Sequence, residues 1–310
     1  MSKIFSLIIQ IRSILFTSKI LRSTKVSVPV IVVGNITVGG TGKTPITLFL
    51  ADWFHDKGKK VGIISRGYKG EKTREQPFIL SENDNAKDYG DEAVYMARES
   101  KAMVCVCKNK TKAAELLIDS GAELIISDDG LQHYKLARDH EIVVIDSTRL
   151  LGNGYYLPAG PLRESSDRLN SVDLILINGG KDEEQNLFLG NAPTLNFNIQ
   201  NEYLVDLNTG QKSKLKDFRG QTFKVLAGLG NPEKIYKKIE DYGIEVIPII
   251  TEDHGLINLE NFNKENAYPL MMTPKDAVKY NGSFPNDTYL LEPTIEIDKN
   301  YFLTIFGQYL

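Results

Sequence analysis

A glycine-rich stretch at residues 34–44 constrains the fold of this 310-residue chain more than any other feature. It reads GNITVGGTGKT and lies between an apolar, β-branched run at 28–33 and an amphipathic segment at 45–57. These flanks predict a buried strand before the glycines and a helix after them. A turn of this kind directs backbone N–H groups and the positive end of a helix toward phosphate. The stretch therefore predicts a loop that binds nucleotide phosphates.

Single positions of this loop carry separate expectations. We expect Lys43 to reach the outer phosphates and the Thr44 hydroxyl to ligate a magnesium ion. The match to G-x-x-x-x-G-K-[ST] is imperfect, because Thr37 stands where the pattern has glycine. An ordinary glycine turn that carries Lys-Thr is the alternative interpretation. The residues expected to bind the nucleotide are Thr37, Gly39, Gly40, Thr41, Gly42, Lys43 and Thr44.

The order of predicted elements indicates two α/β units. Short apolar strands alternate with helices from residue 60 to residue 178, which is typical of a doubly wound, mostly parallel sheet. Polar and apolar residues then alternate, and a turn at 208–210 predicts a β-hairpin linker. A strand, a helix and a strand follow within 223–250, and they predict a smaller α/β domain. The expected divisions are a membrane-associated helix at 1–25, a P-loop domain at 26–194, a two-stranded linker at 195–220 and the smaller domain at 221–310.

Composition argues against several classes of protein. The formal net charge is −3, so no overall basic field favours binding to nucleic acid. Cys105 and Cys107 lie two residues apart on a predicted strand, where both side chains would point to one face. That spacing suits buried thiols in a reducing compartment, and without a second cluster of Cys or His we expect no zinc site.

The N-terminal segment is basic and apolar at once. The first acidic residue is Asp52, and the cations before the glycine-rich loop are Lys3, Arg12, Lys19, Arg22 and Lys25. One face of a helix predicted within 4–21 carries Ile4, Leu7, Ile8, Ile11, Ile14 and Leu15. Arg12 interrupts the apolar run well before the ~18 residues that a spanning helix requires. We expect a helix lying in the plane of an anionic membrane surface, with simple packing on the domain as the alternative.

Acidic residues mark the predicted ligand end of the sheet. Asp128 and Asp129 directly follow an apolar strand, as in P-loop enzymes that present an acid to Mg²⁺, and paired acids repel unless a cation lies between them. A solvated Asp-Asp-Gly turn is the alternative. Asp91 precedes a predicted helix, where a role as N-cap competes with one in the cleft.

Two basic side chains have expected roles in chemistry. His254 follows a strand of the second unit, and a loop histidine next to a carboxylate suits the removal of a hydroxyl proton, although such histidines are usually exposed. Arg163 lies in a turn-rich segment at 151–164 and is expected to clamp an anionic substrate group or the γ-phosphate, with an unpaired surface arginine as the alternative. Arg66 forms part of a basic turn after a strand, and His133 is close to the acidic pair.

Seven motifs, taken in order, resemble the tetraacyldisaccharide 4'-kinase family over nearly the whole chain. They are GNITVGGTGKTP at 34–45, SRGY at 65–68, GDE at 90–92, DDGLQH at 128–133, LPAGPLRE at 157–164, DH at 253–254 and KDAVK at 275–279. The resemblance implies two α/β domains and transfer of the γ-phosphate of ATP to the 4'-hydroxyl of a tetraacyldisaccharide 1-phosphate in lipid A biosynthesis. It also implies that the enzyme is located at the cytoplasmic face of the bacterial inner membrane. Neither nucleic acid nor another protein is expected as a binding partner.

The same resemblance implies the roles of individual residues. Asp91 would pair with His254 and raise its basicity. ATP and Mg²⁺ are the implied cofactors, and the metal residues are Thr44, Glu92, Asp128 and Asp129. The substrate or phosphate would be bound by Arg66, Gln132, His133 and Arg163. Departures from the family pattern are a short N-terminal helix, Gly255 after His254 and Pro274 before Lys275.

Other classes of protein are distinguishable from this one. A partition-type ATPase or GTPase switch carries lysine where this chain has Val38, and no guanine-reading [NT]-K-x-D motif occurs in the sequence. A kinase for a soluble metabolite would leave the basic N-terminal helix packed on the domain. Because the phosphate loop and His254 fall in different predicted units, we also expect a hinge near 195–220.

Overall fold

A parallel sheet forms the core of the first unit. The computed structural model describes residues 2–72, 75–180, 190–228, 232–251, 256–259, 262, 268–280, 282 and 284–310. The parallel strands of this unit are β1 (Val30–Gly34), β2 (Val61–Ser65), β4 (Met103–Val106), β5 (Leu124–Asp128), β6 (His140–Asp146) and β7 (Leu174–Asn178). The short edge strand β3 (Phe78–Ile79) pairs antiparallel with β4. Every residue of β1, β2, β5 and β7 is buried, because helices cover both faces of a parallel sheet.

Helices lie on both faces of this sheet. They are α2 (Lys43–His55), α3 (Ala86–Tyr89), α4 (Asp91–Glu99), α5 (Lys110–Asp119) and the 3₁₀ helix η1 (Ser166–Asn170). Residues of α2 and α4 join one buried apolar cluster, whereas those of α5 join the other. Cys105 and Cys107 are both fully buried in the cluster of α5, so the prediction of buried thiols on one face is confirmed.

The second unit continues the same sheet. Its strands are β10 (Thr222–Leu226), β11 (Glu245–Ile249), β12 (Leu270–Met272) and β13 (Thr288–Glu296), and its helices are η3 (Leu215–Phe218), α6 (Pro232–Glu240) and α8 (Pro274–Ala277). The strand, helix and strand predicted within 223–250 are confirmed as β10, α6 and β11. His254 falls in the sequence between β11 and β12 and lies outside the described residues.

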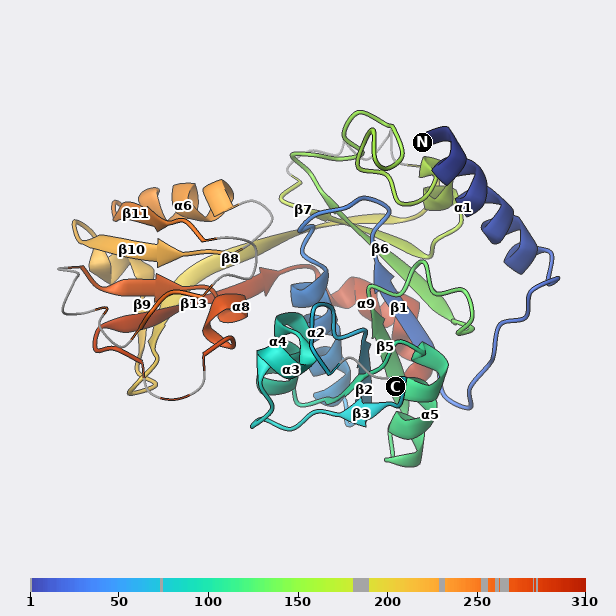
Figure 1. Cartoon of the computed structure of the whole chain (residues 1–310), viewed down its shortest axis with the longest axis horizontal. Helices are drawn as coiled ribbons and strands as arrows, with labels where there is room; N and C mark the ends of the chain where they lie inside the picture. The colour runs from blue at the N-terminus through green and yellow to red at the C-terminus, as the bar shows by residue number, and fades with distance from the viewer. Residues whose placement is uncertain are drawn as a thin grey trace.

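One long strand joins the two units (Figure 1). β8 (Thr194–Asp206) begins in parallel pairing with β7 and ends in antiparallel pairing with β13. The predicted hairpin turn at 208–210 connects β8 to β9 (Lys212–Lys214), but β9 is short, and β13 is the extended partner of β8. The described strands form one sheet in the order β11-β10-β12-β13-β8-β7-β6-β1-β5-β2-β4-β3. Sequence reasoning missed β13 because no local turn marks a pairing between distant segments.

The C-terminal segment returns to the first unit. Helix α9 (Lys299–Phe306) is followed by the 3₁₀ helix η4 (Gly307–Tyr309). Phe302 and Phe306 are fully buried, and the ring of Phe302 lies 5.5 Å from that of Phe49 on α2. Residues 299–310 therefore pack with the helix of the phosphate loop, although we expected them within the division at 221–310.

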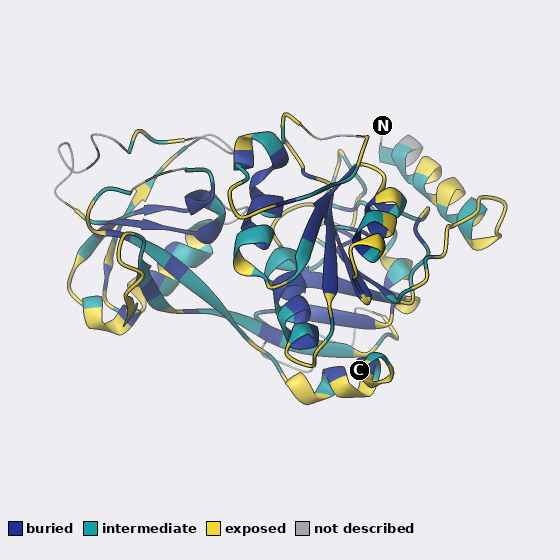
Figure 2. Cartoon of the chain, turned by 90° about the horizontal axis from the view of Figure 1, so that it is seen from below, coloured by how far each residue is buried: buried dark blue, intermediate teal, exposed yellow. Residues whose placement is uncertain are grey.

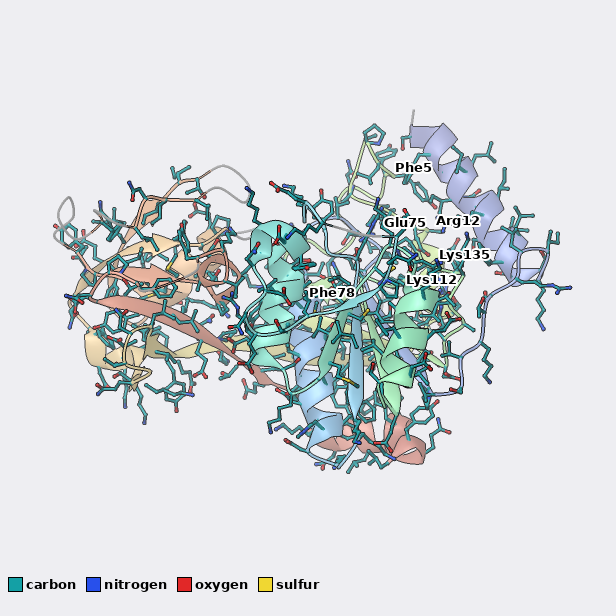
Figure 3. The ribbon with its side chains drawn as sticks, turned by 60° about the horizontal axis from the view of Figure 1, so that its bottom comes forward. Phe5, Arg12, Glu75, Phe78, Lys112 and Lys135 are labelled. Atoms are coloured by element: carbon teal, nitrogen blue, oxygen red, sulfur yellow. The ribbon has the colours of Figure 1, made fainter. Side chains whose placement is uncertain are left out.

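Helix α1 (Ser2–Thr17) lies along the outside of the first unit. The ring of Phe16 stacks on Tyr134 at 5.4 Å, and Arg12 donates to the Gln132 carbonyl at 3.1 Å. Figure 3 shows Phe5 and Arg12 on the side of α1 that faces the rest of this unit. The opposite side of α1 is exposed, as Figure 2 shows. Among the described residues, no helix combines the length and the apolar character needed to cross a membrane.

Candidate active site

The glycine-rich loop joins β1 to α2, as predicted, and neighbouring side chains hold its shape. Gly39 and Gly42 have φ angles of +108° and +100°, a region that side chains disfavour. Arg149 Nη2 donates to the Gly40 carbonyl at 2.7 Å, and a side chain added at Gly39 would start 2.7 Å from Arg149 Nη1. Asn178, at the end of β7, donates to the Thr41 carbonyl at 3.2 Å. The loop conformation thus depends on residues that follow or end β6 and β7.

This loop opens into a cleft of about 540 Å³ between the two units. The predicted nucleotide-binding residues that line the cleft are Gly39, Gly40, Thr41, Gly42, Lys43 and Thr44. Thr37 is buried and forms a bridge with Leu162 instead. From the second unit, Lys234, Lys238 and Lys275 contribute to the same cleft. Cations from both units therefore face one cavity, which suits a polyanionic ligand.

Asp129 is the centre of an ion-pair cluster beside the loop. Arg163 contacts it through two parallel hydrogen bonds, Nη1 to Oδ1 at 2.8 Å and Nη2 to Oδ2 at 3.1 Å. Lys43 Nζ lies 3.8 Å from Oδ1. Burial favours the neutral acid, but the charge of Lys43 and the bonds from Arg163 outweigh it and lower the pKa of Asp129 to about 2. The structure thus brings Lys43, Asp129 and Arg163 together, and it pairs Asp129, which was expected at the metal, with both cations.

Asp128 has a different environment from its neighbour. It is 4% exposed, and its Oδ1 accepts a hydrogen bond from the Thr47 hydroxyl at 3.3 Å. Burial and the nearby Glu92 carboxylate raise the pKa of Asp128 to about 6. The buried Lys110 donates to the Asp128 carbonyl and to Ser127 Oγ, and burial lowers its pKa to about 8. Sequence reasoning missed Lys110, because a lysine at the start of a helix usually points to solvent.

The residues expected to hold Mg²⁺ fit such an ion only in part. Among the described residues, no group of three or more His, Cys, Asp or Glu side chains is arranged around a common metal position. Magnesium sites in P-loop proteins, however, combine few protein oxygens with phosphate oxygens and water. The repulsion between Asp128 and Glu92, which contributes to the raised pKa of Asp128, would be relieved by a cation. The donor set is therefore compatible with Mg²⁺ that binds together with a nucleotide.

The other residues expected to bind substrate have contacts outside the described lining of the cleft. Gln132 Nε2 donates to the Asn35 carbonyl at 3.1 Å and to Glu164 Oε1 at 2.8 Å. Burial, followed by the positive charges of Lys110 and Arg66, lowers the pKa of His133 to about 3. Arg66 is exposed. The described residues that line the cleft do not include Arg66, Gln132, His133 or Arg163.

Of the expected pair of Asp91 and His254, the described residues include Asp91. Asp91 is the first residue of α4, and its Oδ1 accepts from the Glu92 amide at 2.9 Å. The N-cap position belongs to Gly90, so Asp91 does not have the capping role that the residues alone favoured. Because His254 lies outside the described residues, its pairing with Asp91 stays a prediction. Lys275 of α8 is the described cation beside these carboxylates, at 4.0 Å from Asp91 Oδ2 and 2.9 Å from Glu92 Oε1.

The fold and the site define the class of P-loop phosphate-binding proteins. They combine a central parallel strand, a glycine-rich loop, a lysine-threonine pair at the start of a helix and an acidic strand end beside them. The family model for tetraacyldisaccharide-1-P 4'-kinase matches residues 1–310. This chain belongs to that family and is a kinase of this type.

Similar proteins support this assignment. A tetraacyldisaccharide 4'-kinase of Haemophilus influenzae (strain 86-028NP) is 42% identical over 296 residues, covering 94% of this chain and 85% of the relative. One of Histophilus somni (strain 2336) is 42% identical over 281 residues, covering 90% and 82%. A crystal structure described as "apo" form LpxK from Aquifex aeolicus in complex with ATP has a TM-score of 0.79 and 27% identity, covering 99% of this chain and 96% of that one.

Proposed function

We propose that this chain transfers the γ-phosphate of ATP to the 4'-hydroxyl of a tetraacyldisaccharide 1-phosphate. The proposal is carried by the cluster of Lys43, Asp129 and Arg163 beside the phosphate loop, in a chain that belongs to this kinase family throughout its length. Phosphoryl transfer depends mainly on positioning and on neutralising charge, which this cluster is suited to provide. ATP binding by the relative from Aquifex aeolicus supports ATP as the donor.

ATP would occupy the cleft with its phosphates on the glycine-rich loop. The loop amides and the start of α2 favour negative charge there, and Lys43 would contact the outer phosphates. Mg²⁺, when bound, neutralises charge on the β- and γ-phosphates. Thr44, Asp128 and Glu92 are the residues that would hold it. Asp129 would instead orient Lys43 and Arg163, since both cations already contact its carboxylate.

The acceptor hydroxyl requires a base. His254 would take the proton of the 4'-hydroxyl while the hydroxyl oxygen forms a bond to the γ-phosphorus and the bond to ADP breaks. Asp91 would stabilise the imidazolium that results. The anionic disaccharide would be bound by Arg163, Gln132, His133 and Arg66. Asp91 and His254 come from different units, so closure of the cleft would complete the site.

Helix α1 would place the enzyme on the cytoplasmic face of the bacterial inner membrane. Its outward residues Leu7, Ile8, Ile11 and Ile14 are 48–63% exposed, and Lys19 and Arg22 follow the helix. Apolar side chains with adjacent cations favour an anionic lipid surface. We expect the wild type to sediment with phosphatidylglycerol vesicles and a triple Leu7→Gln, Ile11→Gln, Ile14→Gln variant to stay in solution. A matched Leu303→Gln variant should sediment like the wild type, and equal sedimentation of all three proteins would reject the role of α1.

The decisive experiment is transfer of labelled γ-phosphate from ATP to a tetraacyldisaccharide 1-phosphate in detergent micelles. We expect transfer by the wild type, and a loss of about 10²–10⁴-fold in Lys43→Ala and in His254→Ala, because removal of a phosphate contact or of a base has effects of that size. His55→Ala, at the far end of α2, should retain activity. Hydrolysis of ATP without transfer, or transfer only to soluble acceptors, would overturn the proposal.

A further inference from the structure

The second unit presents one lysine to the carboxylates of the first. Lys275 Nζ donates to Glu92 Oε1 at 2.9 Å and lies 4.0 Å from Asp91 Oδ2. Its side chain is 21% exposed and lines the same cleft as the phosphate loop. Figure 1 shows α8 beside α4, and the two helices are in contact. The KDAVK motif thus places a cation at the catalytic carboxylates from across the cleft.

The position of this lysine is well defined by buried contacts of its neighbour. Asp276 is completely buried, and its Oδ2 accepts from the Gly228 amide at 2.8 Å and from the Thr273 hydroxyl at 2.6 Å. Lys279 contacts Asp276 Oδ1 at 2.7 Å. Pro274 starts the short helix with a preset backbone angle. These contacts fix the backbone of α8, so Lys275 is held facing the cleft.

We propose that Lys275 is a phosphate-binding residue that contacts the γ-phosphate of ATP from the second unit, while Lys43 contacts it from the first. This inference rests on the proposed function, in which the KDAVK motif has no assigned role. A transferring phosphoryl group spreads its charge over three oxygens, and cations from more than one direction stabilise it. Lys275 would leave Glu92 for a γ-phosphate oxygen when a nucleotide fills the cleft.

Charge balance in the cleft supports this assignment. Lys43 and Arg163 both contact Asp129, so a single carboxylate already offsets part of the charge of both cations. Lys275 lies within 4.0 Å of two carboxylates, those of Asp91 and Glu92. It compensates the charge of this acidic pair, and an incoming anionic phosphate provides a competing partner. A lysine that only tethers the two units would affect the affinities for nucleotides with and without a γ-phosphate equally.

The test compares the binding of ADP with that of AMP-PNP by calorimetry on the full-length chain in the presence of Mg²⁺. In Lys275→Met we expect affinity for AMP-PNP to fall about 10- to 100-fold, the value of one charge-assisted hydrogen bond, and affinity for ADP to change less than about twofold. Lys275→Arg should restore most of the lost affinity for AMP-PNP. In steady state, kcat should fall more than KM for the lipid rises.

A matched variant isolates the tethering effect. Lys234 of α6 also crosses the cleft, where its Nζ lies 3.3 Å from Asp146 Oδ2. Lys234→Met removes an ion pair between the units, and we expect it to change the affinities for ADP and AMP-PNP by the same factor. Equal effects of Lys275→Met on both nucleotides, or none on either, would overturn the proposal. If the wild type discriminates through Lys275 but transfers no phosphate to the lipid, only the proposed acceptor fails.

Discussion

At the scale of single residues, Asp129 combines a positive φ angle with two ion pairs. Its φ angle is +44°, in a region that aspartate tolerates better than most side chains. This conformation directs the carboxylate toward Lys43 and the fork of Arg163. All three residues belong to motifs of the sequence, but the family resemblance implies a metal-binding role for Asp129. The observed pairing shows why two adjacent aspartates differ, since Asp128 is buried against Thr47 instead.

His133 yields a prediction on pH dependence. Burial and the charges of Lys110 and Arg66 lower its pKa from 6.5 to about 3 in the folded chain. The unfolded chain therefore binds the proton first, so the contribution of His133 to stability is complete above about pH 6.5 and decreases as the pH falls toward 3. Between about pH 7 and pH 5, the wild type should lose more free energy of unfolding than His133→Gln, as measured by urea titration. Parallel losses in both proteins would show that His133 is not held neutral.

At the scale of elements, the helix of the phosphate loop is buried by a distant helix. Phe54 of α2 is fully buried, and its ring lies 5.7 Å from that of Phe306 on α9. Trp53 packs 6.1 Å from Phe302. Because α2 begins at Lys43, α9 supports the element that carries the lysine of the glycine-rich loop. The amphipathic pattern of α2 predicted a buried face, but not which segment covers it.

A pair of variants on α9 tests this support. Phe302→Ala should lower the free energy of unfolding by about 3–5 kcal/mol, because it removes a fully buried aromatic ring. Leu303, its neighbour on the same helix, is 44% exposed, and Leu303→Ala should change stability by no more than about 0.5 kcal/mol. Urea unfolding measures both values. A similar small change in the two variants would mean that α9 contributes little to the core.

At the scale of the whole molecule, a single sheet runs through both units, and among the described strands the ribbon of β8 and β13 connects them. The register of this ribbon shifts between Glu292 and Thr294, around Pro293, which lines the cleft. Irregular pairing bends a strand locally. The ion pairs Lys234–Asp146 and Lys275–Glu92 also cross from one unit to the other. The ribbon is therefore the natural site for bending, within the predicted hinge at 195–220 and its partner β13.

We predict that the two units close on ligand. Small-angle scattering should show a smaller radius of gyration when both AMP-PNP and a tetraacyldisaccharide 1-phosphate are present than in the free protein. The physical reason is that the anionic phosphates attract the cation Lys275 of the second unit toward the loop of the first. ADP alone serves as the control and should produce a smaller change. Scattering curves that are identical in all three states would contradict a hinge.

Consecutive residues were sufficient to predict the class of fold, the glycine-rich loop and the family. These features depend on local periodicity, on the spacing of glycines and on the order of motifs, all of which can be read from consecutive residues. Lys43, Asp129 and Arg163 could each be named from a recognisable motif, but their ion-pair cluster could not. Boundaries of single elements differed by only a few residues, since helix and strand ends carry weak signals.

The folded structure was needed to establish which distant segments meet. It paired β8 with β13, packed α9 on α2 and placed the buried Lys110 beneath Asp128. It also brought Lys275 to Glu92 across the cleft. Such contacts join residues far apart in the chain, and their energy comes from burial and charge pairing that no local pattern encodes. Local motifs therefore predict a phosphate-binding loop, and long-range packing decides which side chains surround that loop.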